Sequence, residues 1–461
     1  MSAGPFAAVL EAAASAEVLR RTGTVVRASG EIAVAHGINL RPHELAFIED
    51  PAGRTLAAES AGSSEGRATL AMLERGAIAH GARVVASGRL AQTPVGRNLL
   101  GRVLDGLGRP MDGGPELHGV RRAPIFAEPP HPLNRAPITR TLPSGVRAID
   151  GFLTLGRGQR VGIFAGSGVG KSTLLGMLAR GTAADITVIA LIGERGREVR
   201  DFIEHDLGLE ALRNCVVVAS TGDNPAAMRL CAANTATAIA EAFRDDGNDV
   251  LLLFDSLTRV AMAQREVGLS AGEPPTTKGY PPSVFSLLPH LMERAGPAEH
   301  GSSTAIYTIL VDGEDMDEPI ADISRATLDG HVVLKRSLAS AGHYPPIDVL
   351  TSVSRLMSRV ASPEHQAAAE QLREVMAAYA DARDLISIGA YASGADPMID
   401  RAIALVPRIN AFLRQPPEEV TGFGEAESRL ESIETGDLEI EEGELMDEPD
   451  TAAFAETGAL S

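Results

Sequence analysis

Residues Val161 to Leu175 read VGIFAGSGVGKSTLL, and the architecture predicted for the whole 461-residue chain follows from this segment. An apolar run that ends at Phe164 leads into a glycine-rich loop, and an apolar helical pattern begins at Lys171. Glycines let successive backbone N–H groups turn toward one anion, and the start of a helix adds its positive dipole end. Because a strand, such a loop and a helix follow in this order, the segment predicts a phosphate cradle for a nucleotide.

The loop residues suit a polyphosphate bound with a metal ion. Lys171 is expected to reach the outer phosphates, and Ser172 to place its hydroxyl on the Mg²⁺ that bridges them. Ala165 stands where the strict G-x-x-x-x-G-K-[ST] pattern has a glycine, and its small side chain is tolerated if φ stays negative. An ordinary glycine-rich turn is the alternative, but the Lys-Ser pair lies at the offset that nucleotide binding requires. The predicted nucleotide contacts are Ala165, Gly166, Ser167, Gly168, Val169, Gly170, Lys171, Ser172 and Thr173.

The composition is that of a globular protein with more than one domain. Hydrophobic residues make up 44% and charged residues 22%, and a chain of this length predicts two or three domains. No apolar stretch is long enough to span a membrane, and the N-terminus lacks the basic start of a signal peptide. Cys215 and Cys231 show no CxxC spacing, which favours a reducing compartment and argues against a metal site held by cysteines. We therefore expect a cytoplasmic protein.

The net charge of −19 is concentrated at the C-terminus. Fifteen acidic residues and only one basic residue, Arg429, follow Pro417, so this segment carries −14 of the total. The rest of the chain is mildly acidic and has no basic footprint, so we expect no nucleic-acid partner. The acidic, aromatic-poor composition predicts disorder beyond about Pro416, with the acidic tail itself at 431–461.

Apolar runs and turn residues divide the rest of the chain into regions. Short β-rich runs separated by turns predict a small β-barrel at 23–90, and the segment 91–135, rich in glycine and proline, is predicted to be a linker. Helical patterns at 361–430 predict a C-terminal α-helical domain. Residues 1–22 form an amphipathic segment with a candidate helix from 3 to about 20, which either frays against its own domain or docks a partner.

Strands of continuous Val, Ile and Leu alternate with helices between 136 and 360. This pattern predicts an α/β core whose parallel sheet is covered on both faces, with the nucleotide at the carboxyl ends of the strands. The strands are predicted at 161–164, 186–192, 216–219, 250–254 and 304–311, and the helices at 171–180, 225–244 and 283–294.

Two carboxylates at predicted strand ends are candidates for the chemistry. Asp255 ends the buried run DVLLLFD, where a Walker B carboxylate would hold Mg²⁺, although a cap of the next helix is the alternative. Glu194 follows the strand that ends at Ile192 and is either placed to polarise the attacking water or a surface residue in an arginine-rich turn. Arg259, one helical turn after Asp255, is a candidate phosphate contact.

The run GHYPPIDVLTSVSR, from Gly342 to Arg355, supplies two further candidates. Tyr344 is suited to stacking on adenine, and Arg355 to neutralising phosphate charge in the transition state. The pattern alone favours structural roles for both residues.

With these residues, the chain resembles the catalytic hexamer family of rotary ATPases, and in particular the flagellar protein-export ATPases of type III secretion systems. The likeness extends from about 140 to 360 and includes the blocks GERGREVRDFIE, LLLFDSLTRVAMAQREVG and DGHVVLKRSLASAGHYPPIDVLTSVSRLM. It implies a RecA-like P-loop NTPase core that hydrolyses ATP with Mg²⁺. It also implies that Lys171 and Ser172 hold phosphate and metal, that Glu194 activates the water, and that Asp255 supports the metal.

The same resemblance implies roles for residues outside the phosphate loop. Arg195 and Arg259 would contact phosphate, and Tyr344 would pack on the adenine. Arg355 would be an arginine finger that reaches into the neighbouring subunit's site, so that activity requires a ring, expected to be a homohexamer.

The resemblance also implies partners. A stalk-like coiled-coil chaperone is expected in the central pore, and a stator-like negative regulator at the N-terminal helix. The membrane export gate and exported flagellar proteins with their chaperones are further expected partners. The protein would then lie in the cytoplasm, peripherally associated with the inner membrane at the flagellar basal body.

Four alternatives remain open. A virulence-type (injectisome) secretion ATPase shares every motif, whereas the blocks at 156–160 and 342–355 disfavour a catalytic subunit of a rotary ATP synthase. A hexameric RNA translocase would need an aromatic and basic N-terminal module, but Phe6 and Phe47 are the only aromatic residues among the first ninety. A purely structural nucleotide-binding subunit is disfavoured by Glu194.

Overall fold

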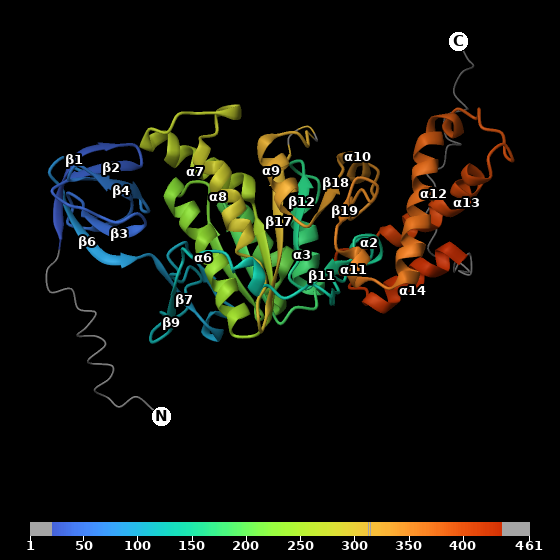
Figure 1. Cartoon of the computed structure of the whole chain (residues 1–461), viewed down its shortest axis with the longest axis horizontal. Coiled ribbons are helices and arrows are strands. Elements are labelled where there is room, and N and C mark those ends of the chain that lie inside the picture. Colours follow the sequence, from blue (N-terminus) through green and yellow to red (C-terminus); the bar gives the residue numbers. More distant parts are fainter. Residues whose placement is uncertain (1–20, 312, 314, 436–461) are drawn as a thin grey trace, which may run out of the picture.

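The computed structural model describes residues 21–311, 313 and 315–435. Within this part, a β-barrel, an α/β core and a group of C-terminal helices follow one another along the long axis of the molecule (Figure 1). The predicted architecture, a parallel-sheet core between a small barrel and a helical region, is confirmed. The predicted N-terminal helix at 3–20 and the acidic tail beyond Thr435 lie outside the described residues.

The barrel is closed by six antiparallel strands in the order β1-β2-β5-β4-β3-β6. Side chains that alternate along these strands, such as Val25, Ala46 and Ile48, are buried in the barrel interior. The strands are β1 (Thr22–Ser29), β2 (Ile32–His36), β3 (Glu44–Glu49), β4 (Thr55–Ser64), β5 (Arg67–Met72) and β6 (Arg83–Leu90).

The segment 91–135 is more structured than the linker that the sequence predicted. It contains β7 (Gln92–Val95), β8 (Val103–Leu104) and β9 (Arg121–Pro124). β7 pairs with β9, and β8 joins the edge of the central sheet. Leu99 and Leu104 are fully buried. The frequent glycines and prolines hid these short strands, because each run of apolar residues is too brief to show a period.

The central sheet has nine strands in the order β19-β18-β12-β17-β15-β13-β14-β8, with β16 paired to β17. Its inner neighbours are parallel, and only β16 and β19 run antiparallel to their partners. The strands not yet given are β12 (Arg160–Ala165), β13 (Ile186–Ile192), β14 (Cys215–Ser220), β15 (Asp249–Asp255), β16 (Gly296–Pro297), β17 (Ser302–Leu310), β18 (Gly330–Leu334) and β19 (Val353–Ser354). Every strand predicted from an apolar run is present.

Helices cover both faces of this sheet. Ile163 packs with Leu174 of α3 on one face, whereas its neighbour Phe164 packs among residues of α6, α7 and α8 on the other. This alternation explains why the strands read as continuous apolar runs. The helices are α2 (Arg147–Phe152), α3 (Lys171–Gly181), α4 (Gly196–Asp201), α5 (Leu209–Leu212), α6 (Ala226–Asp245), α7 (Leu257–Ala271), α8 (Pro282–Glu293), α9 (Pro319–Thr327), α10 (Arg336–Ser340) and α11 (Met357–Val360). A small hairpin of β10 (Thr141–Leu142) and β11 (Leu155–Gly156) precedes β12.

The C-terminal region consists of α12 (Pro363–Ser387), α13 (Pro397–Leu413) and α14 (Phe423–Thr435). The prediction of disorder beyond about Pro416 was wrong for α14, which buries Ala426, Leu430 and Ile433. These apolar residues lie three or four positions apart on one face, but acidic residues on the other face dominate the composition.

Polar contacts connect the C-terminal helices to the core. The buried Arg147 donates from Nε to the Phe412 carbonyl (2.8 Å) and forms an ion pair with Glu419. The Gln415 N–H donates to the Tyr344 carbonyl (2.9 Å). The loop that carries Tyr344 is therefore held between the core and the C-terminal helices.

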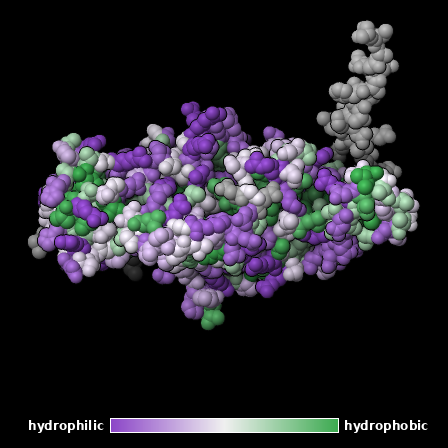
Figure 2. Space-filling view, turned by 90° about the horizontal axis from the view of Figure 1, so that it is seen from above, coloured by the Kyte–Doolittle hydropathy of each residue, from purple (hydrophilic) through white to green (hydrophobic). Residues whose placement is uncertain are grey.

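The surface is mixed in character. Figure 2 shows hydrophobic residues gathered at both ends of the molecule, over the barrel and over the C-terminal helices. Exposed apolar side chains include Phe47 on β3 and Leu385 on α12. In the part of the chain that the structure describes, no helix combines the length and the apolarity that a membrane crossing needs.

Candidate active site

The phosphate loop connects β12 to α3, as the sequence predicts. Ala165 ends β12, is buried, and has negative φ, since the described non-glycine residues with positive φ are His43, Glu65 and Lys278. Gly170 has φ of 99°, and a Cβ atom built on it would lie 3.8 Å from the Tyr344 ring. A glycine at position 170 thus permits the left-handed turn that starts α3.

Three charged side chains from three elements meet at the mouth of this loop. Lys171 Nζ, at the start of α3, lies 2.5 Å from Asp255 Oδ1 at the end of β15 and 3.5 Å from Glu194 Oε1 after β13. All three side chains are largely buried. Because the strands are parallel, their carboxyl ends bring these groups to one edge of the sheet.

Asp255 is oriented by a neighbouring strand and does not cap α7. The cap is Ser256, whose hydroxyl accepts from the Arg259 N–H (3.3 Å). The Thr308 hydroxyl on β17 donates to Asp255 Oδ1 (2.7 Å), and the Asp255 side chain is only 5% exposed. The helix-cap alternative for Asp255 is therefore wrong.

The electrostatics of this cluster favour a charged lysine and a basic glutamate. Burial disfavours the Lys171 ammonium, but the Asp255 and Glu194 carboxylates outweigh it and raise the pKa of Lys171. Burial raises the pKa of Glu194, and the Asp255 charge adds to this shift, although Lys171 opposes it. A carboxylate whose pKa is raised accepts a proton more readily at neutral pH, as a general base requires.

The turn between β13 and α4 places Glu194 and leaves Arg195 outside the cluster. Gly193 has φ of 76°, and a Cβ atom on it would lie only 2.9 Å from Cβ of Arg259. Glycine is thus required for Arg259 to approach the turn. Arg195 points to solvent, with its side chain 85% exposed and an ion pair to Glu198 (3.6 Å). The structure does not bring Arg195 together with the phosphate loop.

Arg259 does face the cluster. Its charge acts on the Glu194 carboxylate to lower the pKa of that group. The Arg259 Nε atom is buried and has no hydrogen-bond partner among the described residues. A buried donor without a partner is suited to donate to a phosphate oxygen when nucleotide binds.

Arg355 lies away from the phosphate loop of its own chain. Gly162 on β12 pairs with His331 on β18, and His331 pairs with Val353 on the antiparallel β19. Arg355 follows β19 and therefore lies toward the start of β12, at the opposite end of the sheet from the loop. Its side chain is exposed, and among the described residues its guanidinium donates only to the Arg325 carbonyl (3.2 Å).

The oxygen donors at the loop fit a magnesium ion held together with phosphates. Ser172 is exposed at the start of α3, and Asp255 offers a carboxylate close by. Among the described residues, no group of three or more His, Cys, Asp or Glu side chains is arranged to hold a metal by itself. Magnesium typically uses one or two protein oxygens and takes the rest from phosphates and water, so the donor set is suited to it.

Three contributors were missed by the sequence patterns. Thr308 orients Asp255, Glu198 shares a hydrogen bond with Glu194, and Arg336 Nη2 donates to the Ser167 carbonyl of the loop (2.8 Å). Each comes from an element distant in sequence or shows no motif spacing. Thr173 was predicted as a nucleotide contact, and its hydroxyl forms a hydrogen bond with the Asp206 side chain.

The fold and the site together define a P-loop ATPase that carries a β-barrel before its core and helices behind it. Residues 145–354 match the model of the ATP synthase alpha/beta family, nucleotide-binding domain, and residues 361–432 match that of the T3SS EscN ATPase C-terminal domain. The chain belongs to the ATP synthase alpha/beta family, in the group of flagellum-specific and type 3 secretion ATPases.

Individual relatives support this placement along most of the chain. The flagellum-specific ATP synthase of Bacillus subtilis is 52% identical over 396 residues, which are 86% of this chain and 90% of the relative. The type 3 secretion system ATPase of Sinorhizobium fredii is 47% identical over 405 residues, 87% of this chain and 90% of the relative. The assembled ATPase EscN of enteropathogenic E. coli, solved in complex with its central stalk EscO, has a TM-score of 0.83 at 44% identity, covering 89% of this chain and 100% of that chain.

Proposed function

We propose that this chain is the Mg-ATP hydrolysing motor subunit that drives export of flagellar proteins through a type III secretion apparatus. The single observation that carries the catalytic part is the meeting of Lys171, Asp255 and Glu194 at the phosphate loop. A loop that only stored nucleotide would not need a buried carboxylate of raised pKa beside the phosphates.

The residues of the chain divide the reaction among themselves. The loop N–H groups and Lys171 hold the β- and γ-phosphates, and Arg259 adds positive charge from α7. Glu194 orients a water for in-line attack on the γ-phosphorus and accepts its proton as the bond to the bridging oxygen of ADP breaks. Ser172 and Asp255 would hold Mg²⁺, which supplies positive charge to the phosphate oxygens.

Tyr344 is proposed to receive the adenine. Its ring is 48% exposed and lies against Gly170, at the end of the loop nearest the C-terminal helices. Its backbone is fixed by Gln415. An exposed aromatic ring held at the edge of a nucleotide loop provides a stacking surface for a base.

Completion of the site is proposed to require a second copy of the chain. Arg355 lies at the far end of the sheet from its own loop, and no carboxylate of the described residues pairs with its guanidinium. An unpaired, exposed arginine is suited to neutralise charge on a γ-phosphate held by the neighbouring subunit. We therefore propose a homohexamer with shared sites, in line with the assembled state of the relative EscN.

The proposed partners follow from the family. A stalk-like coiled-coil chaperone would occupy the central pore, as the EscN complex with its stalk suggests by analogy. A stator-like regulator at the N-terminal helix, the membrane export gate, and flagellar cargo with its chaperones complete the proposal. These partners would hold the cytoplasmic ring at the inner membrane beside the flagellar basal body.

A virulence-type secretion ATPase is the second candidate, because relatives named type 3 secretion system ATPase are nearly as similar. The test is to delete the gene from its host and restore it as wild type or as Glu194→Gln. The flagellar proposal predicts loss of filament export and swimming, recovered by the wild type and not by the variant. Normal swimming with loss of effector secretion would instead support the virulence reading.

A further inference from the structure

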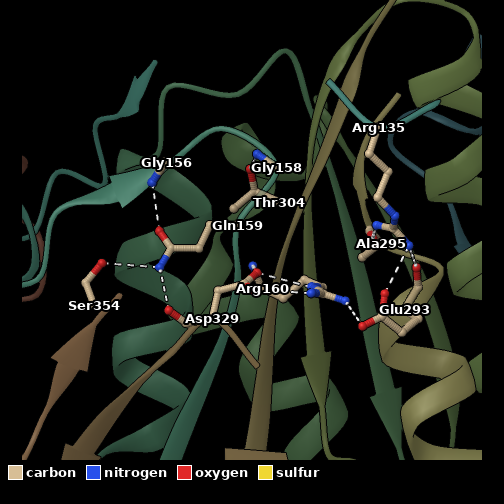
Figure 3. Close-up of polar contacts among 10 residues, drawn as sticks. All are labelled: Arg135, Gly156, Gly158, Gln159, Arg160, Glu293, Ala295, Thr304, Asp329 and Ser354. Carbon is tan, nitrogen blue, oxygen red and sulfur yellow. Dashed lines mark hydrogen bonds and ion pairs between the residues drawn. The ribbon is translucent and has the colours of Figure 1, made fainter. Parts of the chain in front are cut away.

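A buried glutamine joins the start of β12 to the segment that carries Arg355. Gln159 is fully buried, and its side-chain oxygen accepts from the Gly156 N–H (2.8 Å). Its side-chain nitrogen donates to the Asp329 carbonyl (3.3 Å) and to the Ser354 hydroxyl (3.2 Å). Figure 3 shows these three contacts converging on one amide.

The acceptors of this amide are the groups that hold Arg355. The Asp329 carbonyl also accepts from the Arg355 N–H (3.0 Å), and Ser354 immediately precedes Arg355 in the chain. The Ser354 hydroxyl donates onward to the Thr154 carbonyl (2.9 Å). Both ends of the Ser354–Arg355 peptide are thereby anchored to groups that Gln159 contacts.

Charge-assisted contacts hold Asp329 in place. The Asp329 carboxylate accepts from the backbone N–H of Arg160 (3.0 Å) and from its guanidinium (3.2 Å), and Arg160 pairs in turn with Glu293 (2.5 Å). Arg135 donates to the Ala295 carbonyl (2.8 Å) from the same cluster (Figure 3). Charge-assisted bonds of this kind resist displacement more than neutral ones do.

We propose that Gln159 is a positioning residue for Arg355: its amide fixes the direction in which the arginine leaves the sheet, and so sets how it meets the neighbouring subunit's nucleotide. The inference rests on the proposed role of Arg355 in a shared site. Gln159 immediately precedes β12, whose other end, Ala165, opens the phosphate loop. One six-residue strand thus joins the groups that position the arginine to the loop that binds nucleotide in the same subunit.

If Gln159 positions Arg355, Gln159→Met should impair hydrolysis at the site of the neighbouring subunit and leave nucleotide binding in its own loop intact. Methionine keeps the length and volume of the side chain but removes both amide donors and the oxygen that accepts from the Gly156 N–H. A misplaced catalytic group of this kind lowers kcat by roughly 10- to 100-fold. The KM for ATP should change by less than about twofold, because the loop of the variant subunit is intact.

A control variant and a second variant guard against a purely structural effect. Thr304 lies on β17, and its Oγ1 accepts from the Gly158 N–H (2.7 Å) in the turn that precedes β12 (Figure 3). It has no hydrogen bond to Asp329 or Ser354 among the described residues. Thr304→Val should therefore leave kcat near that of the wild type. Ser354→Ala removes only one hydroxyl and should lower kcat in the same direction as Gln159→Met, which keeps the test open if the latter folds poorly.

The decisive experiment mixes full-length subunits. Gln159→Met subunits, with intact loops, are reassembled with Lys171→Ala subunits, whose loops are defective but whose Arg355 is held normally. With equal amounts and random placement, about a quarter of all sites pair an intact loop with a well-held arginine, so ATPase activity should rise clearly above the mean of the two parents. The reference mixture combines Arg355→Ala with Lys171→Ala.

The two mixtures distinguish a failure of the positioning role of Gln159 from a failure of the shared site. A rise in both supports the positioning role. A rise with Arg355→Ala but none with Gln159→Met would overturn it and leave the shared site standing, and an equal loss of kcat in Thr304→Val would do the same. If neither mixture rises, the shared site itself fails and the inference falls with it.

Discussion

Replacing Glu194 by glutamine tests the chemistry of the site with the least change in shape. A positioned general base contributes about 10²- to 10⁴-fold to a rate, so Glu194→Gln should lower kcat by that factor, or by about 3–5 kcal/mol of barrier. The neutral amide also releases Lys171 from one of its two carboxylates, now 3.5 Å away. ATP affinity should therefore stay the same or rise.

The folded state should tolerate this change. Burial raises the pKa of Glu194, which means that the ionised carboxylate is less stable in the folded chain than in the unfolded chain. This cost is present at neutral pH and disappears as the pH falls through the raised pKa, so the uncharged amide removes it at pH 7. Thermal unfolding of the variant should occur at the temperature of the wild type or slightly above it.

The assay is single-turnover hydrolysis at saturating Mg-ATP, with nucleotide binding measured separately by a fluorescent ATP analogue. Glu198→Gln is the matched control, because Glu198 is the neighbouring carboxylate but is 49% exposed and four residues further along the chain. It should hydrolyse ATP at close to the wild-type rate at neutral pH. A kcat for Glu194→Gln within a few-fold of the wild type would refute Glu194 as the base.

We expect three further outcomes, two at the active site and one at a buried ion pair. Glu198 raises the pKa of Glu194 through a hydrogen bond, so Glu198→Gln should move the acid limb of the kcat–pH profile to lower pH; an unmoved or higher limb contradicts this. Thr308→Val removes the donor to Asp255 and should weaken apparent Mg²⁺ affinity by about 10- to 100-fold. A magnesium titration of ATPase activity measures this, and an unchanged midpoint would contradict it. Arg294 is fully buried and pairs with the largely buried Glu241 (2.6 Å). Arg294→Met leaves the Glu241 carboxylate unpaired and should cost about 3–5 kcal/mol of unfolding free energy in urea titrations, where a loss under about 1 kcal/mol would contradict this role of the pair.

Much of the site could be predicted because its residues end buried strands. Asp255 and Glu194 follow continuous apolar runs, and parallel strands bring their carboxyl ends to one edge whatever the details of packing. The residue spacing of the Lys171 loop is sufficient to predict a phosphate-binding loop. Local pattern and sheet topology therefore suffice for the groups nearest the phosphates.

The remaining features depend on contacts between distant segments. Gln159 has no distinguishing pattern in the sequence, and the partners of its side-chain nitrogen come from the distant segments at β18 and β19. The strands of the 91–135 segment and helix α14 were hidden by glycine, proline and acidic composition, although β7, β8 and α14 bury apolar side chains such as Val95, Leu104 and Leu430. Composition reports the exposed face of such elements and not the face that packs.

The role of Arg355 cannot be inferred from a single chain. Among the described residues its guanidinium contacts only the Arg325 carbonyl, so the contacts of this side chain within its own chain indicate no function. Its distance from the loop acquires meaning only when a second subunit is considered.

If one subunit holds the triphosphate and the next completes the site, ATP hydrolysis depends on ring formation. ATPase rate per subunit should be measured against protein concentration for the wild type and for Arg355→Ala, with ring assembly followed by light scattering in the same samples. We expect a steep rise for the wild type as rings form, and little activity for Arg355→Ala at any concentration even when it assembles. A specific rate that is independent of concentration, or an assembled Arg355→Ala ring as active as the wild type, would contradict it.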